Sequence, residues 1–515
     1  MSNRRPKTLM ELIARSGLGT VSIVGNPDVQ ISGLGVNAQK IRRGQLFVAI
    51  AGTRTDSHMM VGDAVGAGAA AVLVERDVPS YPGVTIVRVP NTRQALGLLA
   101  QAWHGHPARS FPICGITGTN GKTTTSNLVS SILKHAGLRT GVIGTLGAFF
   151  NGKSVDLGAT TPSPTDLAEI FEAMEQERID AVAMECSSHA IDQYRLAGIP
   201  IRVGAILNVT QDHLDYHGTI ENYANCKKRL FTEYVLPTRG GVSCFNVDDP
   251  IGRELAASYP GDFITFGRDN PAEVSCEDVV LGANGTSLTL ILRGEKARID
   301  TRFIGSFNVS NMLAAAACVA ALGFPIEVVA AGLKNAPAVP GRFEVVNEGQ
   351  RFTVVVDYAH TPDALERVLR TARRLCTGRL IVVFGCGGDR DRTKRPIMGA
   401  VAGELADYAI VTSDNPRTES PEQIAQAVMK GMLETRMKPS QCSMLVDRRE
   451  AIEQAMMLAG PGDLVLIAGK GHEDYQEIGT RRISFDDRAV ARECIRRIAL
   501  NATTPVVDSS MEQVR

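Results

Sequence analysis

Short apolar runs alternate with amphipathic stretches along most of the chain, and this alternation is typical of an α/β protein. Seven of the runs are nearly continuous in apolar residues; they lie at 68–75, 111–117, 180–186, 203–209, 379–385, 406–412 and 463–469. Runs of this length without polar alternation are typical of strands that are buried on both faces of a parallel sheet. The helical patterns between them predict βαβ units. The expected fold class is therefore α/β with mostly parallel sheets.

The chain is too long for a single core, and two seams rich in proline and glycine divide it. Its 515 residues predict several domains, since one domain usually takes about 100–200 residues. One seam is HGHPARSFP (104–112) and the other is KNAPAVPGRF (334–343). We therefore expect three domains, at 1–109, 110–339 and 340–515.

Composition and charge indicate which kinds of partner and which cell compartment to expect. Lys+Arg and Asp+Glu each number 55, so the net charge is zero and predicts neither nucleic-acid nor membrane binding. Ten cysteines are spread singly without a CxxC pair, which indicates reduced thiols in a cytoplasmic protein. The N-terminal segment is too polar for a signal peptide, and the apolar stretch 313–324 is too short to span a bilayer.

The stretch CGITGTNGKTTT (114–125) follows an apolar run and precedes a helical pattern, as a phosphate loop does. Its glycines let backbone N–H groups approach phosphates, and the helix N-terminus adds its dipole. Lys122 would reach the β- and γ-phosphates, and the Thr123 hydroxyl would ligate Mg²⁺. The strict GxxxxGK[ST] pattern is missed, because Ile116 stands five positions before Gly121. The alternative is a glycine- and threonine-rich turn with a chance lysine, but the strand–loop–helix context favours the phosphate loop.

Two further polar segments follow apolar runs of the same region. Glu185 opens ECSSHA and His213 lies in TQDHLDYHG, both at the expected carboxyl ends of strands, where open α/β sheets bind ligands. Together with Thr123 they are candidate Mg²⁺ ligands. Alternatively, Glu185 is a carboxylate at a helix N-terminus, and His213 is a surface histidine or an Asx-turn partner.

The loop TSDNPRTES combines both signs of charge directly after an apolar run. Arg417 stands beside Asp414, Asn415 and Pro416, which suits a ligand that itself carries both charges, such as an amino acid. The alternative is a loop that leads into a helix capped by Ser420. That cap would explain Ser420 but not Arg417.

Eleven motifs occur in a fixed order along the chain. They are GTNGKTTT (118–125), TTPSP (160–164), ECSSHAIDQYR (185–195), NVTQDHLDYHG (208–218), YANCKKRLF (223–231), GSFNVSNMLAA (305–315), PGRFE (340–344), DYAHTPDAL (357–365), GCGGDRDRTKRP (385–396), SDNPR (413–417) and GKGHEDYQ (469–476). With these motifs the chain resembles the Mur ligases, the cytoplasmic ATP-dependent amide-bond synthetases of peptidoglycan precursors. The resemblance implies an N-terminal UDP-substrate domain, a central P-loop ATPase domain and a C-terminal Rossmann-like domain.

The resemblance is strongest to the ligases that add diaminopimelate, and it implies a reaction. ATP would phosphorylate the γ-carboxylate of UDP-N-acetylmuramoyl-L-Ala-D-Glu, and an amine of meso-2,6-diaminopimelate would attack the acyl phosphate. ATP is then a co-substrate, Mg²⁺ the cofactor, and the partners are small molecules bound by a monomer. Lysine-adding relatives typically lack the arginine of SDNPR, which favours diaminopimelate over L-lysine. The other rivals are a folylpolyglutamate synthetase, which should lack SDNPR and TTPSP, and an ATP-hydrolysing switch or motor.

The resemblance also assigns roles to matching residues. The implied catalytic residues are Lys122, Lys227 and His213. The implied metal ligands are Thr123, Glu185, His213 and Lys227, the last as a carbamylated lysine. The implied ATP contacts are Gly118, Thr119, Asn120, Gly121, Lys122, Thr123, Thr124, Asn308, Asn311, Arg342 and Asp357. The implied contacts to the UDP-sugar dipeptide are Thr160, Thr161, Ser187, Gln193 and Arg195. The implied diaminopimelate contacts are Arg390, Asp414, Asn415, Pro416, Arg417, Gly469 and Glu473.

Some of these positions have plainer interpretations. Lys227 alone reads as a charge on a helix surface, and the neighbouring Lys228 competes with it for the same role. Arg342 and Asp357 could form an interdomain salt bridge, and the two asparagines could serve capping and packing. The N-terminal domain also departs from the family, because Asn37, Ala38 and Gln39 replace the usual DSR. No uridine contact is therefore carried over.

Overall fold

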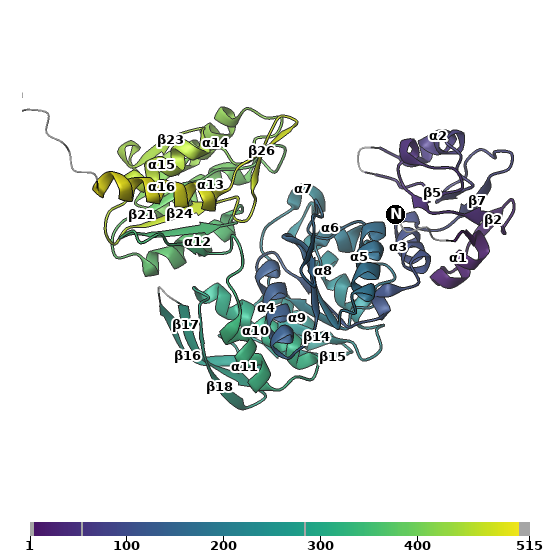
Figure 1. Ribbon diagram of the computed structural model, residues 1–515, viewed down its shortest axis with the longest axis horizontal. Helices are drawn as coiled ribbons and strands as arrows, with labels where there is room; N and C mark the ends of the chain where they lie inside the picture. The colour runs from purple at the N-terminus through teal and green to yellow at the C-terminus, as the bar shows by residue number, and fades with distance from the viewer. Residues whose placement is uncertain (1–4, 53–54, 283–284, 504–515) are drawn as a thin grey trace, which may run out of the picture.

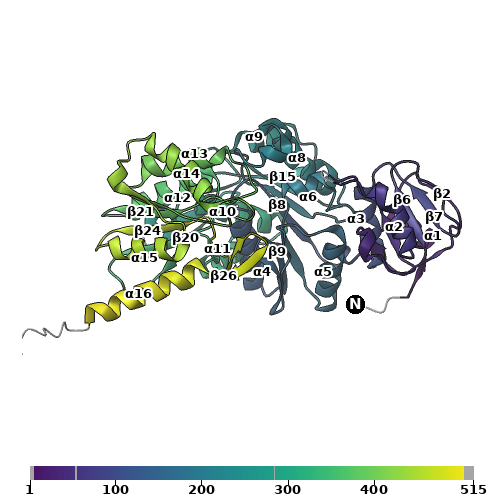
Figure 2. The same cartoon turned by 90° about the horizontal axis from the view of Figure 1, so that it is seen from above.

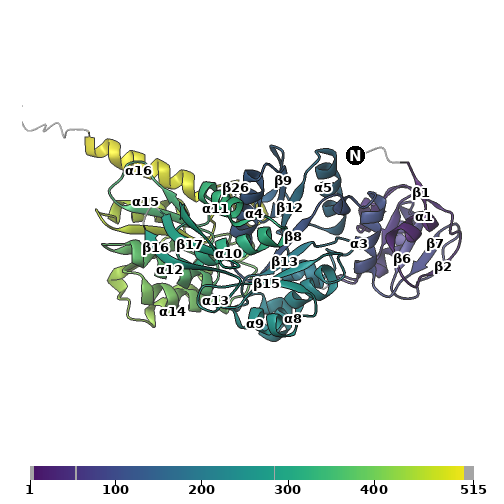
Figure 3. The same cartoon turned by 90° about the horizontal axis from the view of Figure 1, so that it is seen from below.

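The computed structural model describes residues 5–52, 55–282 and 285–503. It contains three large β-sheets, which follow one another along the chain. Figures 1, 2 and 3 show the N-terminal and C-terminal parts at opposite ends of an elongated molecule, with the central part between them. All seven apolar runs contain a parallel strand, so the expected α/β class is confirmed. The two predicted seams lie between the sheets, and the domain boundaries drawn through them stay predictions.

The N-terminal sheet has five strands in the order β2 (Ser22–Val24), β7 (Thr85–Arg88), β6 (Ala71–Val74), β5 (Leu46–Val48) and β4 (Leu34–Gly35). All neighbours are parallel except β2 and β7. A short ladder joins β1 (Lys7–Thr8) to β3 (Gln30–Ile31). Helices α1 (Leu9–Ser16) and α3 (Thr92–Trp103) pack on one face and α2 (Val61–Gly66) on the other.

The central sheet has eleven strands, and its parallel middle carries the phosphate loop. The order is β11 (Lys153–Val155), β10 (Gly147–Phe150), β9 (Thr140–Gly144), β12 (Ala181–Glu185), β8 (Ile113–Thr117), β13 (Val203–Ile206), β14 (Val242–Asn246), β15 (Asp262–Phe266), β16 (Val274–Gly282), β17 (Gly285–Leu292) and β18 (Glu295–Thr301). Strands β9 to β16 in this order are parallel, and both ends are antiparallel hairpins. The carboxyl ends of β12, β8 and β13 therefore meet at one edge.

Helices cover both faces of the central sheet. One face carries α4 (Lys122–His135), α10 (Ser306–Ala321) and α11 (Ile326–Asn335). The other carries α5 (Pro164–Gln176), α8 (Ile220–Arg229) with its π-helical extension Leu230–Val235, and α9 (Pro250–Ser258). The short α6 (Ser188–Asp192) and α7 (Leu214–His217) follow β12 and β13. The apolar stretch 313–324 lies largely in buried α10, and within the described residues no helix has the length and apolar character to cross a membrane.

The C-terminal sheet has six strands in the order β19 (Glu344–Val346), β20 (Thr353–Asp357), β24 (Leu464–Ala468), β21 (Leu380–Phe384), β22 (Tyr408–Val411) and β23 (Cys442–Met444). Only β19 is antiparallel. One face packs against α12 (Pro362–Leu375), α13 (Lys394–Leu405) and α14 (Pro421–Leu433), and the other against α15 (Arg448–Leu458) and α16 (Asp487–Thr503). A hairpin of β25 (Tyr475–Ile478) and β26 (Arg481–Ser484) follows β24.

A buried ion pair fastens the carboxyl ends of two strands of this sheet. The side chains of Arg448 and Asp487 are both fully buried, and two guanidinium nitrogens donate to the two carboxylate oxygens at 2.8 and 2.7 Å. Arg448 also donates to the carbonyls of Ser413 at 3.3 Å and Ala468 at 2.9 Å. These carbonyls precede Asp414 and Gly469, so the pair holds the starts of two of the three predicted amino-acid-binding loops.

Removing the acid of this pair is expected to destabilise the protein strongly. Asp487→Ala leaves the Arg448 guanidinium buried without its counter-charge, which costs about 3–5 kcal/mol of unfolding free energy. Chemical denaturation of the full chain, followed by circular dichroism, measures the loss. The control is Glu493→Ala, which breaks an exposed pair with Arg449 and costs at most about 1 kcal/mol. Equal losses in the two variants would contradict this account.

Candidate active site

The central and C-terminal sheets share one cavity of about 920 Å³. The predicted site residues in its wall are Thr119, Asn120, Gly121, Lys122, Thr123, Thr124, Thr160, Glu185, His213, Asn311, Arg342, Asp357, Arg390, Arg417 and Glu473. The predicted residues outside its lining are Gly118, Thr161, Ser187, Gln193, Arg195, Lys227, Asn308, Asp414, Asn415, Pro416 and Gly469. Groups expected to hold phosphates and groups expected to hold an amino acid therefore face the same space.

The phosphate loop has the predicted strand–loop–helix form. It joins β8 to α4, whose N-cap is Gly121 with φ +91°. A Cβ on Gly121 would lie 2.3 Å from the Asn311 side-chain oxygen, and a Cβ on Gly118 would lie 2.9 Å from Leu207. Both close approaches require glycine. The loop is thus held against α10 and the end of β13.

Two lysines meet at the backbone of this loop. Lys122 Nζ donates to the carbonyls of Gly118 and Thr119 at 2.9 and 2.8 Å, and Lys227 Nζ donates to the Gly118 carbonyl at 2.9 Å. Burial lowers the pKa of both ammonium groups, and the proximity of Lys122 lowers the pKa of Lys227 further. Lys227 is 1% exposed and lies 4.3 Å from the centre of the Tyr223 ring. No ion pair of Lys227 is present among the described residues, so the environment favours its neutral amine.

The structure separates Lys227 from its neighbour on α8. Lys228 turns the other way and pairs with Glu254 at 2.6 Å. The surface interpretation of Lys227 is therefore wrong, and Lys227 is the lysine at the phosphate loop. Its carbamylation stays a prediction.

Glu185 lies at the end of β12 and is held by one threonine. It is 1% exposed, and its two carboxylate oxygens accept from the Thr145 amide at 2.9 Å and from the Thr145 hydroxyl at 3.1 Å. Helix α6 begins only at Ser188, capped by Ser187, so Glu185 is not the N-terminal carboxylate of that helix. Its carboxylate faces the cavity instead.

The five residues predicted to bind the sugar dipeptide form one network around Glu185. Thr160 Oγ1 lies 3.1 Å from Thr145 Oγ1, and Thr161 Oγ1 donates to the Glu185 carbonyl at 2.7 Å. Ser187 N donates to Thr161 Oγ1 at 3.1 Å. Arg195 donates to the Thr161 carbonyl at 2.7 Å and to Gln193 Oε1 at 2.9 Å. The structure thus brings these residues together, with only Thr160 and Glu185 on the cavity wall.

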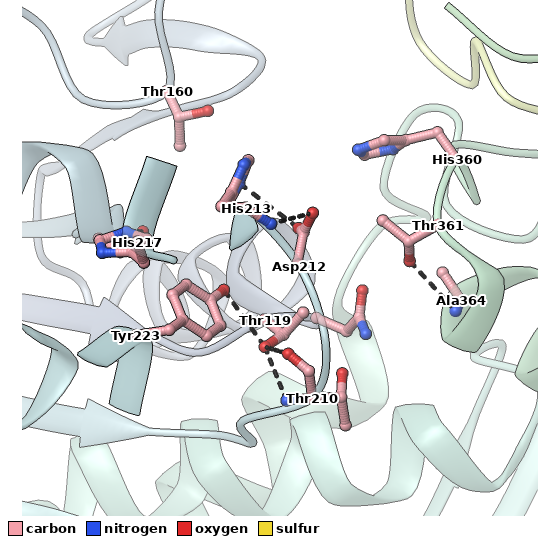
Figure 4. Close-up of polar contacts among 12 residues, drawn as sticks. Thr119, Thr160, Thr210, Asp212, His213, His217, Tyr223, His360, Thr361 and Ala364 are labelled. Atoms are coloured by element: carbon pink, nitrogen blue, oxygen red, sulfur yellow. Dashed lines mark hydrogen bonds and ion pairs between the residues drawn. The ribbon is translucent and has the colours of Figure 1, made fainter. Parts of the chain in front are cut away.

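His213 lies at the N-terminus of α7 in the left-handed conformation, with φ +53°. Its Nε2 is 3.4 Å from Asp212 Oδ2, and its ring contacts those of His189 and Tyr223. Partial removal from water lowers the pKa of His213 to about 4, against the opposing effect of Asp212. Figure 4 shows Asp212 and His213 opposite His360 and Thr361, which belong to the C-terminal domain.

The donor set around the phosphate loop is compatible with Mg²⁺. Among the described residues no three His, Cys, Asp or Glu side chains converge as a complete metal cage. Mg²⁺ typically takes only one or two protein carboxylates, together with phosphates and water. The Glu185 carboxylate and the Thr123 hydroxyl supply such oxygen donors on the cavity wall. His213 would add a neutral imidazole nitrogen.

The predicted nucleotide residues divide into two kinds. Asn311 lines the cavity, whereas Asn308 donates to the Ile304 carbonyl at 2.9 Å and accepts from Asn311 at 3.1 Å. Asp357 accepts from the amides of Phe343 at 2.7 Å and Ala359 at 2.8 Å, and burial raises its pKa to about 6. Among the described residues Arg342 and Asp357 form no ion pair within 4 Å, so the interdomain salt bridge is not the role of this pair.

Hydrogen bonds across the domain seam reach the phosphate loop itself. Arg342 Nη2 donates to Thr123 Oγ1 at 2.9 Å. Asp363, at the start of α12, accepts from Asn120 Nδ2 at 2.7 Å and from Thr210 Oγ1 at 3.1 Å. The C-terminal domain therefore contacts the two residues that flank Gly121 and Lys122.

The three loops expected to bind the amino acid converge, as their positions after strands predicted. Asn415 Nδ2 donates to Glu473 Oε2 at 2.9 Å, and Arg417 Nη1 donates to the Gly388 carbonyl at 2.9 Å. A Cβ on Gly469, which has φ +116°, would lie 2.6 Å from the Asp414 carboxylate. Ser420 caps α14 through the Gln423 amide, so the helix cap and the charged loop are both present.

Sequence reasoning missed several residues of the site. Thr145 carries no motif, and its role appears only through its bonds to Glu185. Asp212 lies within NVTQDHLDYHG, but the motif assigns it no role. Three aspartates that line the cavity after β14 and β15 also carry no motif; they are Asp248, Asp249 and Asp269. In the N-terminal domain, Asn37 replaces the expected DSR with a capped turn, because its side chain accepts from the Gln39 amide at 3.0 Å.

Three models of the Mur ligase family match most of the chain. They are the Mur ligase family catalytic domain at residues 30–104, the Mur ligase middle domain at 116–319 and the Mur ligase glutamate ligase domain at 341–471. The matched segments correspond in order to the three large sheets.

Curated relatives are similar over nearly the whole chain. The UDP-N-acetylmuramoyl-L-alanyl-D-glutamate–2,6-diaminopimelate ligase of Geobacillus kaustophilus is 43% identical over 92% of this chain and 96% of its own length. The ligase of the same name from Gloeobacter violaceus is 42% identical over 95% of this chain and 98% of its own length.

Solved structures have the same architecture. One of them is a UDP-N-acetylmuramoyl-L-alanyl-D-glutamate–2,6-diaminopimelate ligase, with a TM-score of 0.67 and 31% identity over 96% of this chain and 99% of that chain. A Mycobacterium tuberculosis folylpolyglutamate synthase bound to ADP has a TM-score of 0.60 at 22% identity, over 73% of this chain and 91% of that chain, and shares the fold.

A methyl group at the phosphate loop is expected to impair ATP binding. Gly121→Ala would place a Cβ against Asn311 in a left-handed backbone, so the loop must shift and the dissociation constant of ATP should rise at least about tenfold. Calorimetric titration measures it. Gly137→Ala, at the far end of α4, is the matched control, since its φ is +85° and no atom lies within 4 Å of the added Cβ. That variant should lose about 1–2 kcal/mol of stability and keep its ATP affinity. Unchanged affinity in Gly121→Ala would refute the phosphate loop.

Proposed function

This chain belongs to the Mur ligase family, and we propose that it joins 2,6-diaminopimelate to UDP-N-acetylmuramoyl-L-alanyl-D-glutamate in an ATP-dependent reaction. The observation that carries the proposal is the shared cavity, in which Lys122 and Glu185 face the same space as Arg417 and Glu473. One part of this wall suits the activation of an acid by ATP, and the other suits recognition of an amino acid. The names of the relatives with 42–43% identity support the same acceptor and donor.

The first step transfers the γ-phosphoryl group of ATP to the γ-carboxylate of the D-glutamyl residue. A carboxylate oxygen forms the new bond to phosphorus, the bond to the bridging oxygen of ADP breaks, and ADP leaves. The loop from Gly118 to Thr124 holds the phosphates through Lys122 and the backbone N–H groups of Gly121 to Thr124, which stabilise the negative charge of the transition state. The amides of Thr119 and Asn120 donate to Asn208 and fix the shape of the loop. Thr123, Glu185 and His213 would hold Mg²⁺, which neutralises phosphate charge when bound.

The second step is attack by the amine of diaminopimelate on the acyl phosphate. The amine must be neutral to attack, so it loses a proton first; a tetrahedral intermediate then forms and collapses to the amide and inorganic phosphate. Alignment of the two reactants, together with electrostatic stabilisation of the transition state, accelerates this step. Closure of the cavity by the C-terminal domain keeps water from hydrolysing the acyl phosphate. The contacts of Arg342 and Asp363 with the phosphate loop support this arrangement.

The sugar dipeptide is placed by the network around Glu185. Arg195 supplies a positive charge, and Thr160, Thr161, Ser187 and Gln193 supply hydroxyl and amide groups. Their mutual hydrogen bonds support a preformed site, which lowers the ordering cost of binding. The γ-carboxylate would then lie beside the end of β12 and the phosphate loop.

The amino-acid site is formed by Arg390, Asp414, Asn415, Pro416, Arg417, Gly469 and Glu473. Diaminopimelate has two zwitterionic centres, of which one reacts and the other must be recognised. Arg417 would pair with the distal carboxylate, and Asp414 with Asn415 would take the distal ammonium. L-Lysine lacks that carboxylate, so the same site discriminates against it.

After reaction with CO₂, Lys227 would supply carbamate oxygens that would hold a second Mg²⁺. Its buried, neutral amine attacks CO₂, forming a carbamate and releasing one proton, which turns a cation into a carboxylate-like anion. The lowered pKa and the absence of an acidic partner among the described residues support this chemistry. The bond from Lys227 Nζ to the Gly118 carbonyl at 2.9 Å keeps the amine beside the phosphate loop, so the carbamate would form there.

The reaction is a step of peptidoglycan precursor synthesis, and so contributes to cell-wall biogenesis, cell shape and division. We place it in the cytoplasm, which agrees with ten free cysteines, and we expect a monomer. Nothing in this role calls for nucleic acid or membrane.

The direct test is phosphate release with ATP, Mg²⁺ and UDP-N-acetylmuramoyl-L-Ala-D-Glu. Release that requires meso-diaminopimelate and does not occur with L-lysine is the expected result. A preference for L-lysine would keep the ligase but reject this account of Arg417. Turnover that needs neither amine nor sugar nucleotide would leave only an ATPase.

Carbamylation of Lys227 has its own test. Lys227→Ala should lower kcat at least about 100-fold, because it removes charge stabilisation at the phosphoryl group. The neighbouring Lys228→Ala is the control and should keep kcat within about twofold, as an exposed pair contributes little. With ¹³C-labelled bicarbonate, nuclear magnetic resonance should show a carbamate signal in the wild type and in Lys228→Ala. A wild type without that signal would reject the modification.

A further inference from the structure

The hairpin β25–β26 is joined to the SDNPR loop by main-chain hydrogen bonds. Arg417 N donates to the Glu477 carbonyl at 3.0 Å, and Gly479 N donates to the Arg417 carbonyl at 2.7 Å. Arg417 and Ile478 therefore form a parallel bridge. Arg417 has φ +52°, a left-handed conformation that a residue with a side chain keeps only when its surroundings hold it. The hairpin supplies that support.

Gln476 and Glu477 of the hairpin contact three residues of the SDNPR loop. Gln476 Nε2 donates to the Asp414 carbonyl at 2.7 Å, and Glu477 N donates to Asn415 Oδ1 at 3.0 Å. The Glu477 carboxylate lies 2.9 Å from Arg417 Nε. Glu477 thus contacts both Asn415 and Arg417, two of the residues proposed to recognise diaminopimelate.

Arg417 faces the cavity, while two of its guanidinium nitrogens are bonded to groups outside the cavity lining. Its Nε pairs with Glu477 and its Nη1 donates to the Gly388 carbonyl at 2.9 Å. Arg417 lines the cavity, whereas Glu477 and Gly388 are not part of its lining. The Glu477 carboxylate therefore binds the guanidinium from outside the cavity and does not occupy the position of a carboxylate ligand inside it. The remaining N–H groups are left for an anion in the cavity.

The Glu477 carboxylate is itself kept in place. Arg482 Nη2 lies 3.8 Å from its second oxygen, and the Arg482 guanidinium lies 3.6 Å from the centre of the Tyr475 ring. All three side chains belong to the same hairpin, so the holder is built on one rigid unit. A long arginine side chain that is already oriented loses less conformational freedom when it binds a carboxylate.

We propose that Glu477 is a positioning residue for Arg417, which fixes the guanidinium to receive the distal carboxylate of diaminopimelate. This inference rests on the proposed function, in which Arg417 binds that carboxylate. The negative charge of Glu477 opposes the incoming carboxylate only weakly, because the pair is partly exposed, at 22% and 30% of the two side chains. The orientation of the Arg417 guanidinium by Glu477 therefore matters more for binding of diaminopimelate than this charge repulsion does.

The test compares two substitutions that separate orientation from charge. Glu477→Ala removes the acceptor for Arg417 Nε and should raise the KM for meso-diaminopimelate about tenfold, with kcat and the KM for ATP within about twofold. Glu477→Gln keeps an oxygen acceptor without the charge and should raise that KM at most about threefold. In an Arg417→Ala background, Glu477→Ala should add nothing further. Neither Glu477→Ala nor the wild type should turn over with L-lysine.

Glu422→Ala is the matched control. Glu422 is an exposed carboxylate on the helix that follows the same loop, where it accepts from Ser420 at 2.7 Å; its loss should leave every KM unchanged. Equal losses with all three substrates in Glu477→Ala, or an additional loss in the Arg417→Ala background, would overturn the positioning role. So would an unchanged KM for diaminopimelate in both Glu477 variants. These outcomes all require a wild type that uses diaminopimelate, so they differ from failure of the proposed function, in which the wild type does not use it.

Discussion

The hydrogen bonds between the C-terminal domain and the phosphate loop are the contacts on which the active site depends. Arg342 reaches Thr123, and Asp363 reaches Asn120 and Thr210. Without these contacts the carboxyl edges of the two sheets would form two separate surfaces, one for phosphates and one for an amino acid. With them, the two edges enclose a single cavity, as condensation of two bound reactants requires.

These contacts differ in how they respond to substrate. Thr123 Oγ1 is both the acceptor for Arg342 and a proposed metal ligand, so Mg²⁺ and ATP would take Arg342 away from the hydroxyl and leave it free for phosphate. Asn120, by contrast, has its amide, carbonyl and side chain committed to Asn208 and Asp363. The interface between the two domains therefore has one exchangeable contact, that of Arg342, whereas the contacts of Asp363 can persist through the reaction. The buried pair of Arg448 and Asp487 holds the carbonyls of Ser413 and Ala468 and makes no contact with the phosphate loop among the described residues.

Much of the fold could be predicted from local patterns, and the site only in part. Continuous apolar runs identify buried parallel strands, and the polar residues after them gather at the carboxyl edge of their sheet. This reasoning placed Glu185 and His213 at the edge of one sheet and Arg417 at the edge of another, but that the two edges line one cavity is seen only in the structure. Long-range pairings have no such local signal. Asn120 and Asp363 are 243 residues apart, and Thr145 is an ordinary residue in a glycine-rich strand end. Of the adjacent lysines, only the packing of α8 decides that Lys227 is buried and Lys228 is not. Family resemblance, rather than periodicity, selected Lys227.

The hairpin that follows β24 has a consequence for how acceptor preference can be moved between proteins. Asp414, Asn415 and Arg417 are each held by a residue from positions 476–477, so the short loop and the distant hairpin form one structural unit. A graft of the five-residue loop alone would carry the arginine into a new host without the carboxylate that orients it. Exchange of acceptor preference by recombination or by engineering therefore requires both segments, separated by about sixty positions of chain, to travel together.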